Sequence, residues 1–218
     1  MGFYTLVAFF QKGGTFMYPI LLVFAIGLAI AIERYIQLNR IRIANNGVWK
    51  KLHPVLTQGE FKKARQMVNK DKSRMAQMLS MGLARQGAVR RREDIEIAME
   101  ESMMEIIPQL EKRTPYVALL SNIATLLGLL GTIMGLIEAF TAVANANPAE
   151  KADLLSASIS VAMNTTAFGL MAAIPLLLLH AKLTSTTGQI IDGLEMASIK
   201  ALNTISNFAK RQFETDES

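Results

Sequence analysis

The sequence of 218 residues has no cysteine, one tryptophan and two histidines. The absence of cysteine excludes a disulfide scaffold, a thiol nucleophile and a cysteine-ligated metal. No nucleophile–base pair, metal-ligand set or phosphate-binding loop is recognisable, so an enzyme is disfavoured and we expect neither a cofactor nor a bound metal. Charge is scarce as well, because Asp, Glu, Lys and Arg make up 19% of the chain, against about 25% in typical soluble domains.

The missing charges leave three long gaps in the chain. Residues 13–32, 114–137 and 154–181 carry no charged side chain, in runs of 20, 24 and 28 residues. A helix needs about 20 mostly apolar residues to cross the roughly 30 Å core of a bilayer. The runs therefore exclude a soluble globular domain. They predict an all-α integral membrane protein with transmembrane helices at 15–33, 115–143 and 154–182.

The positions of the basic residues predict the orientation of these spans. Of the 23 Lys and Arg, one lies in the first 15 residues, one in 144–153, 17 between Glu33 and Pro115, and four from Lys182 onward. Because Lys and Arg stay on the cytoplasmic side, we expect the N-terminus and the loop 144–153 outside the cell membrane. The region 34–114 and the tail 183–218 are then cytoplasmic.

Further expectations concern the N-terminus and two places in the cytoplasmic region. Residues 1–14 have apolar side chains spaced as in an amphipathic segment lying on the outer interface, and the first span reads as a retained anchor rather than a cleaved signal. The run Arg90 to Arg92 has no interleaved aromatic residues, so no nucleic-acid binding is expected. The three residues Asn45-Asn46-Gly47 are expected to break the chain after the first span.

The polar regions carry a helical pattern and no strand pattern. Apolar residues recur at helical spacing from Glu60 to Leu83, from Arg92 to Leu110 and from Ile190 to Phe208. The last of these stripes is expected to continue the third span as one helix. The pattern predicts a helical bundle beside the membrane, into which the second and third spans extend.

Small and hydroxyl-bearing residues follow one face of each of the last two spans. Small residues four apart let membrane helices approach closely, and they occur here at Ala124, Gly128, Gly131, Gly135 and Gly169. At about 100° per residue, one stripe contains Ser121, Thr125, Gly128, Thr132 and Gly135. The other contains Ser158, Ala162, Thr165 or Thr166, Gly169 and Ala173. Two interpretations stay open: a narrow polar path for an ion, or hydroxyls that bond their own i−4 carbonyls.

Residues 128–140 and 162–175 resemble the second-span and third-span signatures of the ExbB/TolQ/MotA ion-channel family. Three spans with one large cytoplasmic loop are similar to ExbB and TolQ, whereas MotA proteins have four spans. The resemblance implies a homo-oligomeric ring, a pentamer, in the bacterial inner membrane. It also implies a partner like ExbD or TolR, whose single span carries an aspartate, and a TonB-like protein that is energised for outer-membrane transport. The transported ion would be a proton.

The same resemblance implies roles for particular residues. Thr132 and Thr166 match the threonines that line the ion path, and Thr165 is a further candidate. Their hydroxyl oxygens keep sodium open as the ion. Val161 stands where ExbB-type proteins have a glutamate, five residues before the third-span threonine. TolQ-like envelope maintenance, another MotA-type motor and a non-conducting membrane scaffold are the alternative functions.

Three residues have two interpretations each. Glu138 lies about 120° around the helix from Thr132, so it is either a solvated acid at the helix end or part of an entrance or subunit contact. Pro115 and Pro175 each remove a backbone hydrogen bond and predict kinks, either as fixed bends near the cytoplasmic mouth or as moving hinges.

Overall fold

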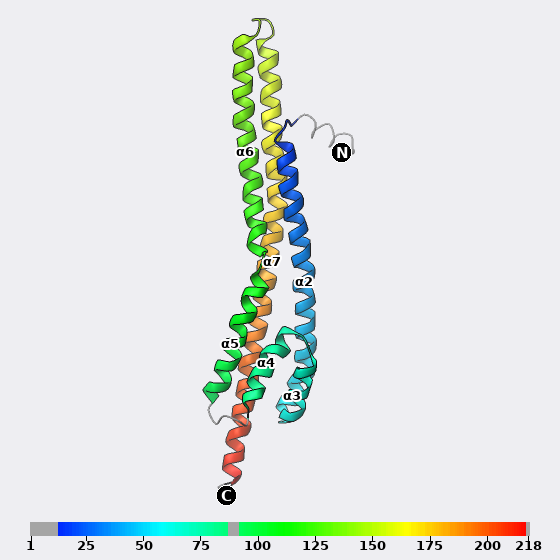
Figure 1. Cartoon of the computed structure of the whole chain (residues 1–218), viewed down its shortest axis with the longest axis vertical. Coiled ribbons are helices and arrows are strands. Elements are labelled where there is room, and N and C mark those ends of the chain that lie inside the picture. Colours follow the sequence, from blue (N-terminus) through cyan, green and yellow to red (C-terminus); the bar gives the residue numbers. More distant parts are fainter. Residues whose placement is uncertain (1–12, 87–91, 217–218) are drawn as a thin grey trace. The chain divides into compact units, whose positions relative to one another are not determined.

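The computed structural model describes residues 13–86 and 92–216, which form helices joined by short turns (Figure 1). These described residues contain no β-strand, which confirms the all-α prediction. Residues 1–12 of the predicted amphipathic segment lie outside the described part. The helices are α2 (Met17–Thr57), α3 (Phe61–Lys70), α4 (Arg74–Arg85), α5 (Arg92–Glu111), α6 (Thr114–Asn145) and α7 (Lys151–Asp216).

Three helical stretches of the described chain are long and apolar enough to cross a membrane. They are Met17–Thr57, Arg92–Asn145 and Lys151–Ala209; the last two contain the second and third uncharged runs, and the first contains residues 17–32 of the first run. The prediction of a multi-pass membrane protein is therefore confirmed. The 41 residues of α2 and the 66 residues of α7 exceed the roughly 20 that a bilayer needs, so both helices continue well beyond their spans.

The contacts divide the chain into two units. The membrane unit consists of Met1–Arg34 and Arg113–Leu183, and the bundle unit consists of Tyr35–Lys112 and Thr184–Ser218. Helices α2 and α7 contribute residues to both units. The prediction that the C-terminal stripe continues the third span is confirmed, because α7 is one uninterrupted helix. The non-helical connection between α6 and α7 comprises only residues 146–150.

In the membrane unit, α2, α6 and α7 lie side by side (Figure 1). Their shared core is small and is built around Ile20, Ala124, Ala172 and Ala173, with aromatic and aliphatic side chains packed against it. Many large apolar side chains point away from this core, for example Leu22 at 63% and Leu178 at 68% exposed. Such surfaces must be covered by lipid or by other chains.

In the bundle unit, the predicted apolar faces form the core. The side chains of the helical stripes that are buried there include Met75, Met78, Leu79, Leu83, Ile95, Met99, Ile106, Leu110, Ile190, Leu194, Ala197, Ala201, Leu202 and Ile205. Helix α4 packs between α3 and α5. Helix α2 ends in a turn at Gly59, whose φ of 76° favours glycine. The Glu60 amide donates to the Val55 carbonyl at 3.2 Å, which closes the last turn.

The predicted break at Asn45-Asn46-Gly47 is wrong, because α2 continues through all three residues. The side chain of Asn45 is buried in the bundle unit, and its Oδ1 accepts a hydrogen bond from the Met75 amide at 3.1 Å. Met75 lies in the first turn of α4, and Ser73 caps that helix as well, since its Oγ accepts from the Ala76 amide at 3.2 Å. The asparagine thus supplies an N-terminal cap to α4 from another helix, and this contact outweighs its local preference for a turn.

Candidate ion-path lining on the second and third spans

The backbones of α6 and α7 touch at two glycines. A Cβ on Gly128 would lie 3.2 Å from the Gly169 Cα, and a Cβ on Gly169 would lie 2.8 Å from the Ala124 carbonyl oxygen. The distance at Gly169 is too short for a side-chain carbon, and the one at Gly128 is tight and directed at backbone, so glycine on both helices permits this close crossing. Farther along α6, a Cβ on Gly135 would lie 2.9 Å from the Ala162 Cβ. These small residues place the threonines of the two spans within reach of one another.

The hydroxyls of Thr132 and Thr166 are hydrogen-bonded to each other across the two helices. Both also face the Gly128 carbonyl, to which Thr166 Oγ1 donates at 2.8 Å and Thr132 Oγ1 at 3.2 Å. Thr132 thus bonds its own i−4 carbonyl, as the second interpretation predicts, whereas Thr166 bonds a carbonyl of the neighbouring helix. A polar path for an ion stays a prediction. Each hydroxyl has one hydrogen and two lone pairs. The three contacts therefore share two hydrogens, and the lone pairs that remain can accept a hydrogen bond from a further group.

This threonine pair lies in an open groove of about 610 Å³ on the membrane unit. Apart from the two hydroxyls, the groove is apolar, because its other lining residues are Leu129, Ile133, Met163, Ala167 and Leu170. Thr132 and Thr166 are both partly exposed, and Met163 is 64% exposed. The groove is therefore an apolar surface with one polar position, and it is accessible to the side chains of another helix.

Thr165 lies apart from this pair. It is 2% exposed, and its hydroxyl is hydrogen-bonded to the carbonyls of Gly13 and Val161. Its methyl group fills the space beside Gly131, where a Cβ would collide with it. The structure thus brings Thr132 and Thr166 together and places Thr165 in the contact between helices of the same chain. Its neighbour in sequence is about 100° away around α7, which accounts for the different surroundings.

The other predicted residues lie outside the groove. Glu138 is exposed on α6, seven residues before the end of that helix. Pro115 lies in the first turn of α6, where a missing N–H costs no helical hydrogen bond; the break between α5 and α6 comes before it. Pro175 lies inside α7, which continues on both sides. The described residues contain no cluster of His, Cys, Asp or Glu that could hold a metal.

The sequence analysis missed an ion pair between the first and second spans. Arg113 Nη1 donates to both carboxylate oxygens of Glu33, at 2.7 and 2.9 Å. The next residue, Arg34, is 2% exposed. A signal was present in the sequence, because Glu33 ends the first uncharged run and Arg113 precedes the second. Both ends are expected on the same side of the membrane, so opposite charges there are natural partners.

Similarity to known proteins indicates the same family. The family described as the MotA/TolQ/ExbB proton channel family matches residues 70–196, more than half of the chain. A biopolymer transport protein ExbB homolog from Methanothermobacter thermautotrophicus is 26% identical over 89% of this chain and 68% of its own length.

Two other relatives come from bacteria. A biopolymer transport protein, ExbB-like 1, from Synechocystis is 29% identical over 84% of this chain and 72% of its own length. The Tol-Pal system protein TolQ from Haemophilus influenzae is 35% identical over 39% of this chain and 37% of its own length. The family match covers both glycine-paired spans and about half of the bundle unit. The chain belongs to the MotA/TolQ/ExbB proton channel family.

Proposed function

We propose that this chain is the channel subunit of an ion-driven motor in a bacterial inner membrane. In this proposal the groove of Thr132 and Thr166 faces a titratable acid on the span of a partner protein. The observation that carries it is the hydrogen-bonded threonine pair, partly exposed, at the only polar point of the described groove. Family membership supports ion conduction as the general activity.

The chemistry of the groove suits a partner whose acid alternates between two states. A lone carboxylate in a membrane is costly unless polar groups face it. A protonated acid can donate to the free lone pairs of the threonine pair. After ionisation the same hydroxyls can turn and donate to the carboxylate, at the cost of their hydrogen bonds to the Gly128 carbonyl. A proton is therefore the first choice of ion, and sodium, which prefers oxygen ligands, is the second.

The proposed assembly follows from what one chain leaves uncovered. Several copies, five in the family arrangement, would form a ring around single-span partners like ExbD or TolR and would drive a TonB-like protein. The exposed apolar residues on α6 and α7 support contacts with other helices. The 17 basic residues between Glu33 and Pro115 support a cytoplasmic bundle unit and an outer N-terminus. TolQ-like envelope maintenance remains the second choice, supported by the TolQ relative.

The test replaces the two hydroxyls in cells that express the chain with its partners. We expect Thr132→Ala and Thr166→Val to abolish ion-driven output, measured as uptake through a TonB-dependent receptor, while the size of the purified assembly stays the same. Thr166→Ser keeps the hydroxyl and is expected to retain output. Thr141→Ala is the matched control, because Thr141 on α6 also bonds its i−4 carbonyl, at 2.8 Å, but lies outside the groove.

Full output in both Thr132→Ala and Thr166→Val would reject the proposal and favour a non-conducting scaffold. The ion is identified separately, by measuring output in sodium-free medium during titration with a protonophore. Output that survives without sodium and falls with the protonophore assigns the proton. Output that disappears without sodium assigns sodium.

A further inference from the structure

The helices of the bundle unit have opposite charges. Helices α3 and α4 carry six basic residues and no acidic residue, whereas α5 carries seven acidic residues and one arginine. In the part of the chain that the structure describes, none of the seven acids of α5 forms an ion pair. A net charge of +5 for the whole chain hides this separation. Unpaired charges of opposite sign on one molecule favour contacts between copies.

The outer face of α5 has the composition of an interface. Ile97 and Met104 are 52% and 72% exposed, and residues seven apart lie on one stripe of a helix. We call this surface the acidic stripe, because acids flank the two apolar side chains on both edges; its members are Glu93, Ile97, Glu100, Glu101, Met104 and Glu105. An apolar centre with a charged rim is typical of protein interfaces. The stripe extends about 18 Å along the helix.

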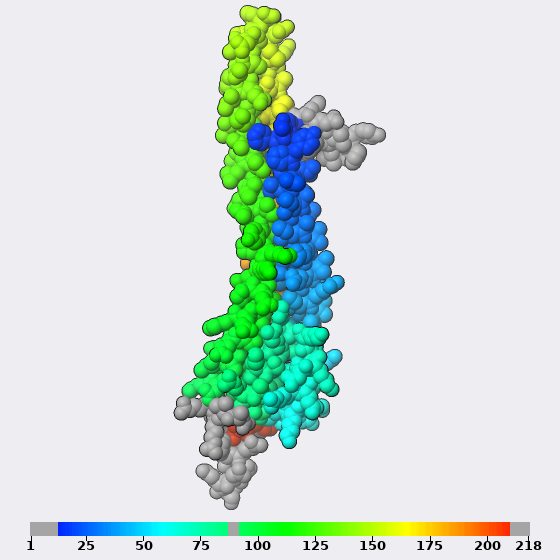
Figure 2. All heavy atoms as spheres, in the orientation of Figure 1, coloured from blue at the N-terminus to red at the C-terminus, as the bar shows by residue number. Residues whose placement is uncertain are grey.

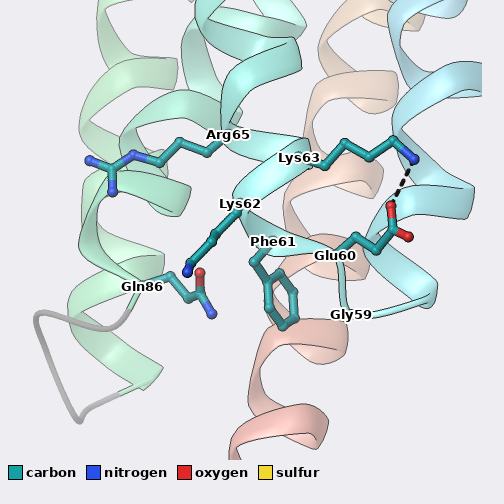
Figure 3. Close-up of a pocket in the computed structure, with 7 residues that line it drawn as sticks. All are labelled: Gly59, Glu60, Phe61, Lys62, Lys63, Arg65 and Gln86. Carbon is teal, nitrogen blue, oxygen red and sulfur yellow. Dashed lines mark ion pairs between the residues drawn. The ribbon is translucent and has the colours of Figure 1, made fainter.

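A complementary surface lies at the start of α3. A pocket of about 780 Å³ is lined there by residues 59–63, Arg65 and Gln86 (Figure 3). Lys63 turns to Glu60, with which it forms an ion pair of 2.8 Å, while Lys62 extends toward Gln86 and Arg65 points away from both (Figure 3). Neither Lys62 nor Arg65 has an ion-pair partner among the described residues. Phe61 gives the pocket an apolar wall. We call this surface the basic pocket.

The acidic stripe and the basic pocket belong to helices on opposite sides of the bundle unit. Helix α4 packs against both α3 and α5 and separates them, as Figures 1 and 2 show for the cyan and green segments. A chain therefore cannot bring its own stripe to its own pocket. The bilayer surface is an unsuitable occupant as well, because α3 follows Thr57, 22 residues or about 33 Å along α2 from Tyr35. That distance is several times the Debye length of about 8 Å at physiological salt.

We infer that the acidic stripe of one copy docks on the basic pocket of the next copy. Met104 and Ile97 would lie against Phe61, while Glu100 and Glu101 would face Lys62 and Arg65. Because the two surfaces differ and lie on opposite sides, the contact is heterologous and repeats around a closed ring. The inference rests on the proposed function only in requiring several copies in one assembly.

Cross-linking in membranes tests the contact, and the absence of natural cysteine makes each introduced thiol unique. Two differently tagged full-length chains are co-expressed, one with Met104→Cys and the other with Gln86→Cys, and treated with a short bis-maleimide. We expect cross-linked products that carry both tags, and little product from either variant expressed alone. No mixed product, or products of Met104→Cys alone, would overturn the inference, the latter because it means that two stripes meet.

Charge exchange gives a second, independent measurement. Lys62→Glu with Arg65→Glu on the Gln86→Cys chain is expected to lower the mixed cross-link at least about five-fold, as loss of two rim pairs does. Glu100→Lys with Glu101→Lys on the other chain is expected to restore it. Lys50→Glu with Lys51→Glu is the matched control, because it makes the same charge change at exposed sites on α2.

The outcomes separate the contact from the function. An unchanged cross-link after Lys62→Glu with Arg65→Glu, or an equal loss with the α2 control, overturns the charge pairing. Ion-driven output measured in the same cells tests the proposed motor function. Output without the mixed cross-link refutes only the contact, and the cross-link without any output refutes only the proposed motor.

Discussion

The membrane unit and the bundle unit are both built from helices, yet their helices are held together by different contacts. In the membrane unit, α6 and α7 touch through backbone atoms at Gly128 and Gly169. In the bundle unit, the space above Gly82 is filled by the side chain of Met99 from α5, and large aliphatic side chains form the core. Lipid exerts no hydrophobic force between helices, so close backbone packing must replace it. Water drives the burial of large side chains directly.

Polar side chains follow the same division. In the membrane unit, Ser121 and Thr166 bond carbonyls of a neighbouring helix, Ser121 to the Ala173 carbonyl at 2.8 Å. In the bundle unit, Asn45 and Ser73 cap the amides at the start of α4. The first arrangement sets the distance between two continuous helices, and the second fixes where a short helix begins. Substitutions at three sites test how much these contacts contribute to stability.

The largest effect is expected at the glycine crossing of the membrane unit. We expect Gly169→Ala to destabilise the chain by about 2–3 kcal/mol, because an inserted carbon must push two backbones apart. Its Cβ would lie 2.9 Å from the Gly128 Cα, and no side chain there can move away. The measurement is the thermal unfolding of the purified protein in detergent.

The matched control for this crossing is the same substitution at Gly193 on α7. A Cβ at Gly193 has nothing within 4 Å, so Gly193→Ala is expected to stabilise the helix by up to about 1 kcal/mol through its higher helix propensity. Equal effects of the two substitutions would show that the close approach of α6 and α7 contributes little.

A smaller effect is expected at the cap in the bundle unit. Asn45→Ala removes the acceptor of the buried Met75 amide and is expected to cost about 1–2 kcal/mol. Asn46→Ala changes the same residue type at the next, exposed position, so little change is expected there. Protease cleavage within α4 of the purified protein reports the local loss, and equal cleavage in both variants would contradict the cap.

Most of the fold could be predicted because its signals are local. Uncharged runs give the spans, and helical spacing gives the buried side chains of the bundle, such as Leu79 and Ile106. The role of Asn45 was not predictable, since its partner Met75 is 30 residues away in sequence. The candidate site could be predicted only in part, because it also depends on contacts between residues far apart in sequence. Spacing places Thr165 and Thr166 near one stripe, but which of them meets Thr132 depends on how α7 is rotated against α6.

The smallest effect is expected at Arg113, which joins the first and second spans through an ion pair and has a strained backbone. Arg113 has a φ of 67° and pairs with Glu33. A non-glycine residue in this conformation costs about 1 kcal/mol, and a half-exposed ion pair contributes at most about that much. Arg113→Gln loses the pair and keeps the strain, whereas Arg113→Gly loses both. We therefore expect Arg113→Gly to be more stable than Arg113→Gln in thermal unfolding, by about 1 kcal/mol.

Glu33→Gln separates the two contributions, because it weakens the ion pair and leaves the Arg113 backbone unchanged. Glu33→Gln should lower the free energy of unfolding by as much as Arg113→Gln does, because both substitutions remove the same ion pair. If Arg113→Gln were destabilising and Glu33→Gln were not, the arginine would be acting through a contact other than Glu33. The buried Arg34 beside it would then be the first neighbour to test, since removal of one guanidinium changes the field at the other.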